Sequence, residues 1–387
     1  MGDIYLDNSA TTPVLPEVVE AMGQVMLSAY GNPSSLHGKG LQAEKLIQAS
    51  RRQVAEVLGV EPREIFFTSG GTEANNWSVL GAARKRRGRG RHLVTTSIEH
   101  ASVLHAFRIL EDEGFQATYL PVNKKGLLQL EVLARVLHQG TVLVSVMHVN
   151  NEVGSVQKLA EIGSLIREKA PEALFHVDAV QGFGKLPLNP TKASIDLVSL
   201  SAHKIHGPKG VGALYIKKGV FLESLLVGGE QEGSLRAGTE NVPGIVGLGL
   251  AAEKAGKRLE DNGSILRELK EELARGILRI PGAHLNGPGG EESAPHILNV
   301  CFDGVDRGEV LVHMLEEKGV YVSTGSACHS RRTEPSHVLK AMGLQEERLF
   351  GAIRISLSPF NTMEQIQEAP DILSKVVREF RELRGGL

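Results

Sequence analysis

The spacing of apolar residues along the first two thirds of the chain predicts helices that alternate with strands. Residues 16–29 place apolar side chains on one helical face, and the same spacing leads to a helix that ends near Gly59. A further strand, 141–149, is almost continuously apolar, which is typical of a strand buried on both faces. This alternation predicts a mainly parallel sheet covered by helices. The other expected strands are 65–68, 93–96, 117–120, 174–177, 197–200 and 213–216, and the other expected helices follow 71, span 103–110 and span 159–166.

The order of elements changes at about residue 260, which predicts a second and smaller α/β domain. A helix with apolar residues at 266, 269, 273 and 277 leads to strand 297–302. Helix 310–315, strand 353–357 and a charged final helix follow. Ligands of open parallel sheets bind at the carboxyl ends of the strands, so the chemistry is expected there.

Composition indicates a globular protein and excludes a disordered or fibrous one. Of the 387 residues, 41% are hydrophobic and 23% are charged. No apolar run approaches the ~20 residues that span a bilayer, and the segment MGDIYLDNSA lacks the pattern of a secretory signal. Leu6 stands where a myristoylation signal needs Ser or Thr. We therefore expect no membrane association and a cytoplasmic location.

Charge and cysteine content exclude several further classes of protein. The net charge of −2 is far from that of a protein held to nucleic acid by its overall field. Two cysteines form neither a disulfide framework nor a CxxC metal site, and the 14 histidines include no HExxH pair, so no metal is expected. One stretch is strongly basic: 84–91, RKRRGRGR, which is either a solvated helix end or a contact for RNA or an acidic partner.

Three groups at the ends of predicted strands point to a shared cofactor. Lys204 follows the apolar strand IDLVSL and precedes a glycine-rich turn, where a desolvated amine can form a Schiff base. Asp178 ends the strand FHVD and can keep a pyridine nitrogen protonated. Ser69-Gly70-Gly71-Thr72 opens a helix after a strand and offers N–H groups and a hydroxyl to a phosphate. Each feature alone has a structural explanation, but together they predict pyridoxal 5′-phosphate.

The sequence resembles the cysteine desulfurases of the NifS/IscS type, in the class V aminotransferase group of fold-type I pyridoxal-phosphate enzymes. The resemblance extends from YLDNSATT to the region of Arg354. It implies a large cofactor-binding domain at 16–257 and a small domain formed by 1–15 and 258–387. The motifs that carry it are GNPSSLHGKG, TSGGTEANN, SIEHASV, HVNNEVGSVQ, HVDAVQGFGK, SLSAHKIHGPKGVGALY, RAGTENVPGIVG and STGSACHS.

The resemblance implies a role for each matching residue around the cofactor. Lys204 would carry the cofactor as a Schiff base, Asp178 would pair with the pyridine nitrogen, and Gln181 would contact the ring hydroxyl. His100 would stack on the ring and act in proton transfer. The phosphate would be held by Thr72, Ser201 and His203, with backbone of Gly71.

The resemblance also implies a homodimer and a binding site for the carboxylate of L-cysteine. Thr239, in RAGTEN, would reach the phosphate of the other subunit. Asn8, Asn150 and Arg354 would hold the substrate carboxylate, for which the guanidinium fork of arginine is well suited.

Cys328 distinguishes a desulfurase from an ordinary aminotransferase. It lies in a polar stretch, 323–337, that is rich in turn formers and is followed at once by His329, Arg331 and Arg332. Reactive thiols occupy such exposed, electropositive places. Cys301 lies within the apolar strand ILNVCF and is expected to be an inert core residue. The resemblance implies that Cys328 takes sulfur from L-cysteine as a persulfide, that alanine leaves, and that the sulfur passes to an acceptor protein.

Two departures from the family pattern leave alternatives open. His329 follows Cys328 where the NifS/IscS type commonly has Thr, and ACHS resembles selenocysteine lyases, so a selenium substrate is an alternative. The long C-terminal tail with which some relatives engage an iron–sulfur scaffold is not evident after RELRGGL. The acceptor is therefore an iron–sulfur scaffold, a tRNA-thiolation enzyme or another protein, and the sequence does not choose among them. A binding or regulatory protein without turnover is the remaining alternative, and the presence of both Lys204 and Cys328 argues against it.

Overall fold

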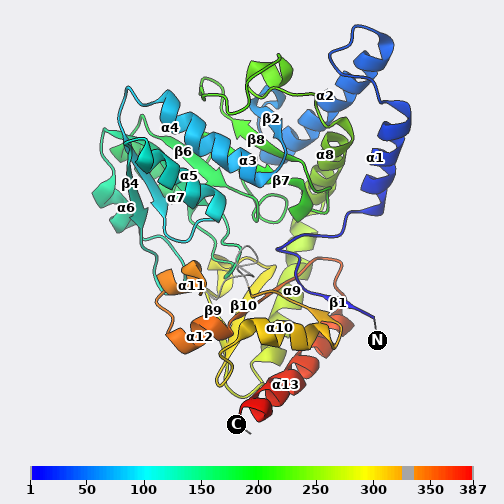
Figure 1. Ribbon diagram of the computed structural model, residues 1–387, viewed down its shortest axis with the longest axis vertical. Coiled ribbons are helices and arrows are strands. Elements are labelled where there is room, and N and C mark those ends of the chain that lie inside the picture. Colours follow the sequence, from blue (N-terminus) through cyan, green and yellow to red (C-terminus); the bar gives the residue numbers. More distant parts are fainter. Residues whose placement is uncertain (1, 325–334, 386–387) are drawn as a thin grey trace.

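A seven-stranded sheet forms the larger part of the molecule (Figure 1). In the computed structural model, which describes residues 2–324 and 335–385, the strand order is β2-β8-β7-β6-β5-β3-β4. The pairs from β4 to β7 are parallel, whereas β8 is antiparallel to both β7 and β2. The mainly parallel sheet is thus confirmed, with one antiparallel edge. Its strands are β2 (Ile65–Thr68), β3 (His92–Thr96), β4 (Gln116–Leu120), β5 (Thr141–Met147), β6 (Leu174–Asp178), β7 (Leu197–Ser201) and β8 (Gly212–Ile216).

Helices cover both faces of this sheet, which explains the continuous apolar run of β5. Val144 packs in a core with α2, α6, α7 and α8, whereas Leu143 packs in a second core with α3, α4 and α5, and neither side chain is exposed. Alternate residues of a strand point to opposite faces, so a strand between two helical layers must be apolar at every position. The helices are α1 (Pro16–Ser28), α2 (Gly38–Leu58), α3 (Gly71–Asn76), α4 (Ala82–Lys85), α5 (Ala101–Asp112), α6 (Leu130–Val136), α7 (Leu159–Lys169) and α8 (Val242–Lys257).

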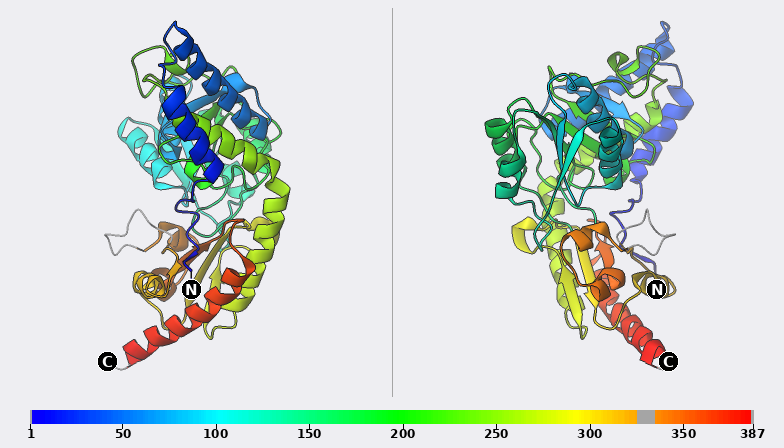
Figure 2. Two further views of the ribbon diagram at one scale, coloured as in Figure 1. Left: turned by 90° about the vertical axis from the view of Figure 1, so that its right-hand side faces the viewer. Right: turned by 60° about the vertical axis from the view of Figure 1, so that its left-hand side comes forward.

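A smaller unit packs against the large sheet and has its own core (Figures 1 and 2). Its central strand β10 is antiparallel to both β9 and β12, and the N-terminal β1 pairs in parallel with β11. The long helices α9 and α13 pack together along this unit. The elements are β1 (Ile4–Tyr5), α9 (Leu259–Ile277), β9 (Ala283–Asn286), β10 (Ile297–Phe302), α10 (Gly308–Glu316), β11 (Val320–Tyr321), α11 (His337–Ala341), α12 (Glu346–Gly351), β12 (Ile353–Ser356) and α13 (Met363–Gly385).

The two units contact each other at the carboxyl ends of the parallel strands. Met147, at the end of β5, packs with Cys301 of β10 and Val338 of α11 in one buried cluster. The domain boundaries predicted at 15/16 and 257/258 fall between the main cores, because Val18–Ala252 supplies the large core, whereas Ile4, Leu6 and residues from 266 on supply the small one. These boundaries stay a prediction.

The basic stretch 84–91 is held against the chain's own surface. Arg84 forms an ion pair with Glu113 at 2.5 Å, Arg89 pairs with Glu172, and Arg87 donates to the Glu113 carbonyl. These contacts favour a solvated helix end over a contact for RNA. Within the described ranges, no helix is long and apolar enough to cross a membrane.

Candidate active site

A cavity of about 330 Å³ lies between the carboxyl ends of the parallel strands and the small unit. Loops after β2, β3, β5, β6 and β7 form its floor, the N-terminal segment crosses beside it, and Arg354 of β12 enters from the small unit. The cavity therefore brings together nine residues predicted to act in one site: Gly71, Thr72, His100, Asp178, Gln181, Ser201, His203, Lys204 and Arg354.

Lys204 reaches the cavity because a single 3-10 turn, Ala202–Lys204, follows β7 directly. Its Nζ donates hydrogen bonds to the backbone carbonyls of Ser9 and Ala10, at 2.6 and 2.7 Å. The N-terminal segment thus fixes the amine at the edge of the cavity.

Asp178 presents a buried carboxylate at the end of β6, with only 5% of the residue exposed. Asn75 donates from Nδ2 to its Oδ2 at 2.7 Å, and the Val180 N–H donates to its Oδ1 at 3.0 Å. These two donors fix the orientation of the carboxylate, so that it can pair with a cationic partner in the cavity.

His100 is the N-cap of α5, and its protonation follows from its contacts. The Ser102 N–H donates to Nδ1 at 3.2 Å, which leaves the proton of the neutral ring on Nε2. Burial lowers the pKa of His100 below its usual value, so the ring is neutral at physiological pH. Asn75 also donates to the Ser102 hydroxyl at 2.9 Å, which links the histidine to the carboxylate of Asp178.

The opposite end of the cavity is a cup of small residues and hydroxyl groups. A Cβ added at Gly71 would lie 2.7 Å from Cγ2 of Val180, so only glycine fits at this point. Ser201, His203 and Thr72 line the same cavity. Burial and the nearby Lys204 charge lower the pKa of His203 to about 4, so its neutral ring acts as a hydrogen-bonding group.

These residues fit pyridoxal phosphate. A lysine amine, a buried carboxylate with its own donors, and a cup of hydroxyl and backbone N–H groups all border one cavity. The neutral imidazole of His100 supplies a flat surface beside them. An aldehyde, a ring nitrogen and a phosphate each have a complementary group here.

Arg354 lies at the small-unit side of the cavity and is nearly completely buried. Its guanidinium forms an ion pair with Asp7 at 2.7 Å and donates to the Asn151 carbonyl at 3.0 Å. These bonds orient the fork, which lines the cavity that holds Lys204.

Three other predicted residues are not brought into the cavity. Asn8 donates to the Ser356 carbonyl, and Asn150 donates to the Ile98 carbonyl, each at 3.0 Å. The Asn150 oxygen accepts two further backbone N–H bonds, and its neighbour Asn151 lines the cavity instead. Both amides therefore stabilise the chain's own backbone. Thr239 is exposed and does not line the cavity of its own chain.

Cys328, His329, Arg331 and Arg332 lie outside the described residues, but both flanks of their segment are placed beside the cavity. Before it, Ser323 exchanges backbone hydrogen bonds with Arg354. After it, Ser336 donates to the Glu152 carboxylate at 2.5 Å, and His337 bonds the Glu99 carbonyl at 3.0 Å. The segment that carries Cys328 thus starts and ends at this site. Cys301 is 1% exposed and burial raises its pKa, as expected for a core thiol.

The structure adds residues that the sequence patterns did not single out. Asn75, Ser102, Glu152 and His337 line the cavity, and Lys185 donates to Oε1 of Gln181 at 3.3 Å. Asn75 and Ser102 belong to the motifs TSGGTEANN and SIEHASV. Their closeness in sequence to Thr72 and His100 is the signal by which they could have been predicted as site residues.

Comparison with known proteins gives a consistent picture. The aminotransferase class-V family matches residues 4–368. A cysteine desulfurase IscS from Methanosarcina thermophila is 46% identical over 380 residues, which cover 98% of this chain and 93% of that protein. A cysteine desulfurase IscS from Clostridium botulinum is 44% identical, covering 98% and 96%. The solved structure of a NifS-like protein superposes with a TM-score of 0.92 at 42% identity, covering 97% of this chain and 100% of that one.

Proposed function

Because the chain belongs to the aminotransferase class-V family and is a pyridoxal-phosphate-dependent cysteine desulfurase, we propose that the cavity around Lys204 removes sulfur from L-cysteine and releases alanine. The observation that carries this proposal is the convergence of Lys204, Asp178 and Arg354 on one cavity. An amine, a carboxylate and a carboxylate-binding guanidinium are the groups that such a reaction of an amino acid needs.

The described residues divide the binding of the cofactor among them. Lys204 would hold it covalently, Asp178 would pair with its ring nitrogen, and Gln181 would bond its ring hydroxyl. The phosphate would be bound by Thr72, Ser201 and His203, together with the N–H of Gly71. The bound cofactor supplies an electron sink for the carbanion of the amino acid.

Two groups of the protein move protons. The Lys204 amine would remove the substrate α-proton, and the Ser9 and Ala10 carbonyls hold its Nζ in place. His100 would lie against the cofactor ring, and its neutral imidazole carries the proton on Nε2, from which it would be available for transfer. Asn75 fixes both His100 and Asp178, so it acts as a positioning residue.

The sulfur leaves on a thiol of the protein. The Cys328 thiolate attacks the substrate sulfur, the carbon–sulfur bond breaks, and its electron pair stays with carbon, which takes up a proton. The net reaction converts L-cysteine and one thiol into alanine and one persulfide. Arg354 would hold the substrate carboxylate in a fork that Asp7 orients.

We further propose that two chains form a homodimer with shared sites. Thr239 is exposed, yet its segment is anchored beside the phosphate cup, because Arg236 binds Glu73 at 2.9 Å and Glu73 accepts from the Ser69 N–H. Large apolar side chains of the large unit are also exposed, which favours a covered surface. They are Leu27, Tyr30, Leu36, Phe221 and Val227, between 70% and 106% exposed.

The persulfide would pass to an acceptor protein in the cytoplasm, either an iron–sulfur scaffold or a tRNA-thiolation enzyme. Two relatives carry the name IscS, which supports the scaffold as acceptor.

Replacement of Lys204 by alanine tests the proposed function. The variant should lose the visible absorbance of the lysine-bound cofactor and all formation of alanine and sulfide from L-cysteine. Lys209→Ala, a nearby exposed lysine in the same turn, is the matched control and should keep both. Normal absorbance and turnover in Lys204→Ala would refute the assignment.

A further inference from the structure

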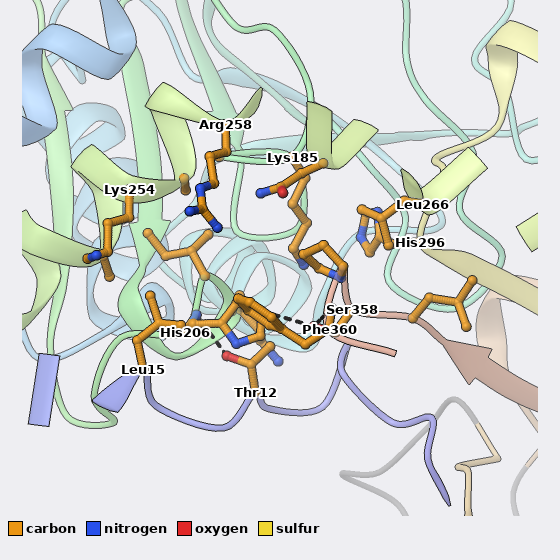
Figure 3. A pocket seen from close by; sticks show the side chains of 18 of the residues that line it. Thr12, Leu15, Lys185, His206, Lys254, Arg258, Leu266, His296, Ser358 and Phe360 are labelled. Carbon is orange, nitrogen blue, oxygen red and sulfur yellow. Dashed lines mark hydrogen bonds between the residues drawn. The ribbon is translucent and has the colours of Figure 1, made fainter. Parts of the chain in front are cut away.

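A second cavity, of about 220 Å³, lies on another side of Lys204 at the junction of the two units. It is bordered by the N-terminal segment, by α8 and α9 of the large and small units, and by the chain after β12 (Figure 3). Three residues of its lining also belong to the surroundings of the first cavity. Lys204 lines both cavities, Thr12 donates to the His203 carbonyl, and Lys185 donates to Gln181. None of the roles proposed for desulfuration uses this space.

The walls of this second cavity are mostly apolar. Leu15, Ile205, Leu266, Leu357 and Phe360 face it, from four different segments of the chain. Such a lining with a few polar groups is typical of a small-molecule site and provides room for a hydrocarbon body.

Basic side chains outnumber acidic ones in the lining of the second cavity, which includes Lys185, Lys204, Lys254 and Arg258. Lys185 and Arg258 extend from one wall toward Thr12 and Phe360 on the other (Figure 3). Glu17 is the acidic residue of the lining, and it is already paired with Lys254 at 2.8 Å. Among the described residues, the Arg258 guanidinium has no hydrogen-bond acceptor. Burial lowers the pKa of Lys185 to about 7, so Arg258 is the one of these two groups that stays fully charged at neutral pH, and no hydrogen bond joins it to the paired Glu17.

His296 provides an independent sign of a ligand. Its side chain is completely buried and lines the cavity beside Leu266 (Figure 3). Neither ring nitrogen has a hydrogen-bond partner among the described residues. Burial and the nearby Lys185 charge keep the pKa of His296 well below its usual value, so the ring is neutral and carries one N–H donor. A buried polar group without a partner is costly, and an acceptor in the cavity would remove that cost.

We propose that this second cavity binds a small organic carboxylate without an amino group, whose carboxylate meets Lys185, His296 and Arg258 and whose hydrocarbon chain lies against the apolar walls. This site goes beyond the desulfurase reaction. Amino acids are disfavoured, because their ammonium group would lie near the Arg258 guanidinium while the acidic residue of the lining, Glu17, is already paired. The cavity therefore distinguishes its ligand from both L-cysteine and alanine.

Calorimetric titration of the holoenzyme with sodium hexanoate tests the site. We expect saturable binding, no binding of hexylamine or L-alanine, and much weaker binding of 1-hexanol and of inorganic phosphate, which lack the charge and the chain respectively. Arg258→Gln should weaken hexanoate binding about tenfold or more, since a hydrogen bond to a charged group is lost. Lys257→Gln is the matched control, because Lys257 is the preceding residue, 71% exposed, and pairs with Glu253 outside the cavity.

His296→Phe separates a binding role from a structural one. The substitution keeps an aromatic side chain but removes two buried nitrogens that have no partner. The thermal stability of the variant without hexanoate should therefore not fall. The increase in Tm that hexanoate gives the wild-type holoenzyme should disappear. The proposal is overturned if hexanoate does not saturate the wild type, or if both Arg258→Gln and His296→Phe bind it as the wild type does. These readouts do not depend on desulfurase turnover, so their failure leaves the proposed function untouched.

Discussion

Asn75 donates a hydrogen bond of 2.7 Å from Nδ2 to Oδ2 of Asp178, although 103 positions separate the two residues. Both are nearly completely buried, at 1% and 5% exposed. The bond joins α3, the helix after β2, to the end of β6, and it fixes the carboxylate that is proposed to pair with the cofactor nitrogen.

Removal of this bond should slow the reaction without releasing the cofactor. We expect Asn75→Ala to reduce kcat about tenfold, because hydrogen bonds to buried charged groups contribute roughly 1.5–3 kcal/mol. Asp178→Asn should retain pyridoxal phosphate but react more slowly still, because the ring nitrogen loses its counter-charge. Both effects are measured as alanine formation together with bound-cofactor absorbance.

The adjacent asparagine provides the control for this prediction. Asn76 donates to the Ser102 carbonyl at 2.9 Å and does not bond Asp178, so Asn76→Ala should keep a near-normal kcat. Equal losses in Asn75→Ala and Asn76→Ala would assign the effect to helix packing rather than to the carboxylate.

The sequence was sufficient to predict the site residues that stand at the carboxyl ends of parallel strands. Lys204 and Asp178 each follow a recognisable buried strand, and parallel strands bring their carboxyl ends to one edge. The antiparallel direction of β8 was not predictable from its apolar pattern, because that pattern is the same in either direction. The choice between Asn150 and Asn151 depends on which side chain a turn directs inward, and neither residue type nor spacing determines that. His296 gave no signal, because burial of a polar group depends on contacts between distant segments.

The buried carboxyl group of Glu99 should make stability depend on pH. Burial raises the pKa of Glu99 from 4.5 to about 8, despite hydrogen bonds from Thr96 and the Met147 N–H. The folded protein therefore keeps a proton that the unfolded chain loses above a pH of about 4.5. The contribution of Glu99 to the free energy of unfolding is therefore fully present below a pH of about 4.5 and is lost as the pH rises toward about 8.

Glu99→Gln should remove this dependence, because an amide stays neutral at every pH. We expect the Tm of the variant to fall less than that of the wild type between about pH 5 and pH 8. Glu111→Gln, on the exposed side of α5, is the control and should follow the wild type. Parallel curves for Glu99→Gln and the wild type would contradict a protonated Glu99.

Shared sites predict complementation between two inactive subunits. A hybrid dimer would pair a Thr239→Ala subunit with a Lys204→Ala subunit. If Thr239 acts across the interface, the one site that has Lys204 receives an intact Thr239 from its partner and stays active. If Thr239 acts within its own chain, that site carries the defect itself. A monomer by sedimentation at assay concentration would also exclude shared sites.

The two cysteines should differ in reactivity. A free thiol with a pKa near ~8.5 is only slightly ionised at neutral pH, and we expect the charges of His329 and the two arginines after it to favour the thiolate of Cys328. Burial raises the pKa of Cys301, whose thiol donates to Asn286. Cys328 should therefore be alkylated faster by iodoacetamide, as measured by mass spectrometry of digested samples taken over time. Faster labelling of Cys301 would contradict this order.

Substitution of Cys328 tests the sulfur transfer itself and separates the two candidate substrates. Cys328→Ser should bind L-cysteine and change the cofactor spectrum, because cofactor chemistry precedes sulfur transfer, yet it should release almost no sulfide. Cys301→Ser is the control and should release sulfide normally.

Selenium is a better leaving group than sulfur, so direct elimination from selenocysteine can proceed without a protein thiol. Sulfide release by Cys328→Ser at the wild-type rate would refute the persulfide route. If the variant loses activity on L-cysteine but keeps strong activity on selenocysteine, the kcat/KM values of the wild type for the two amino acids decide which is the substrate. We expect the higher value for L-cysteine.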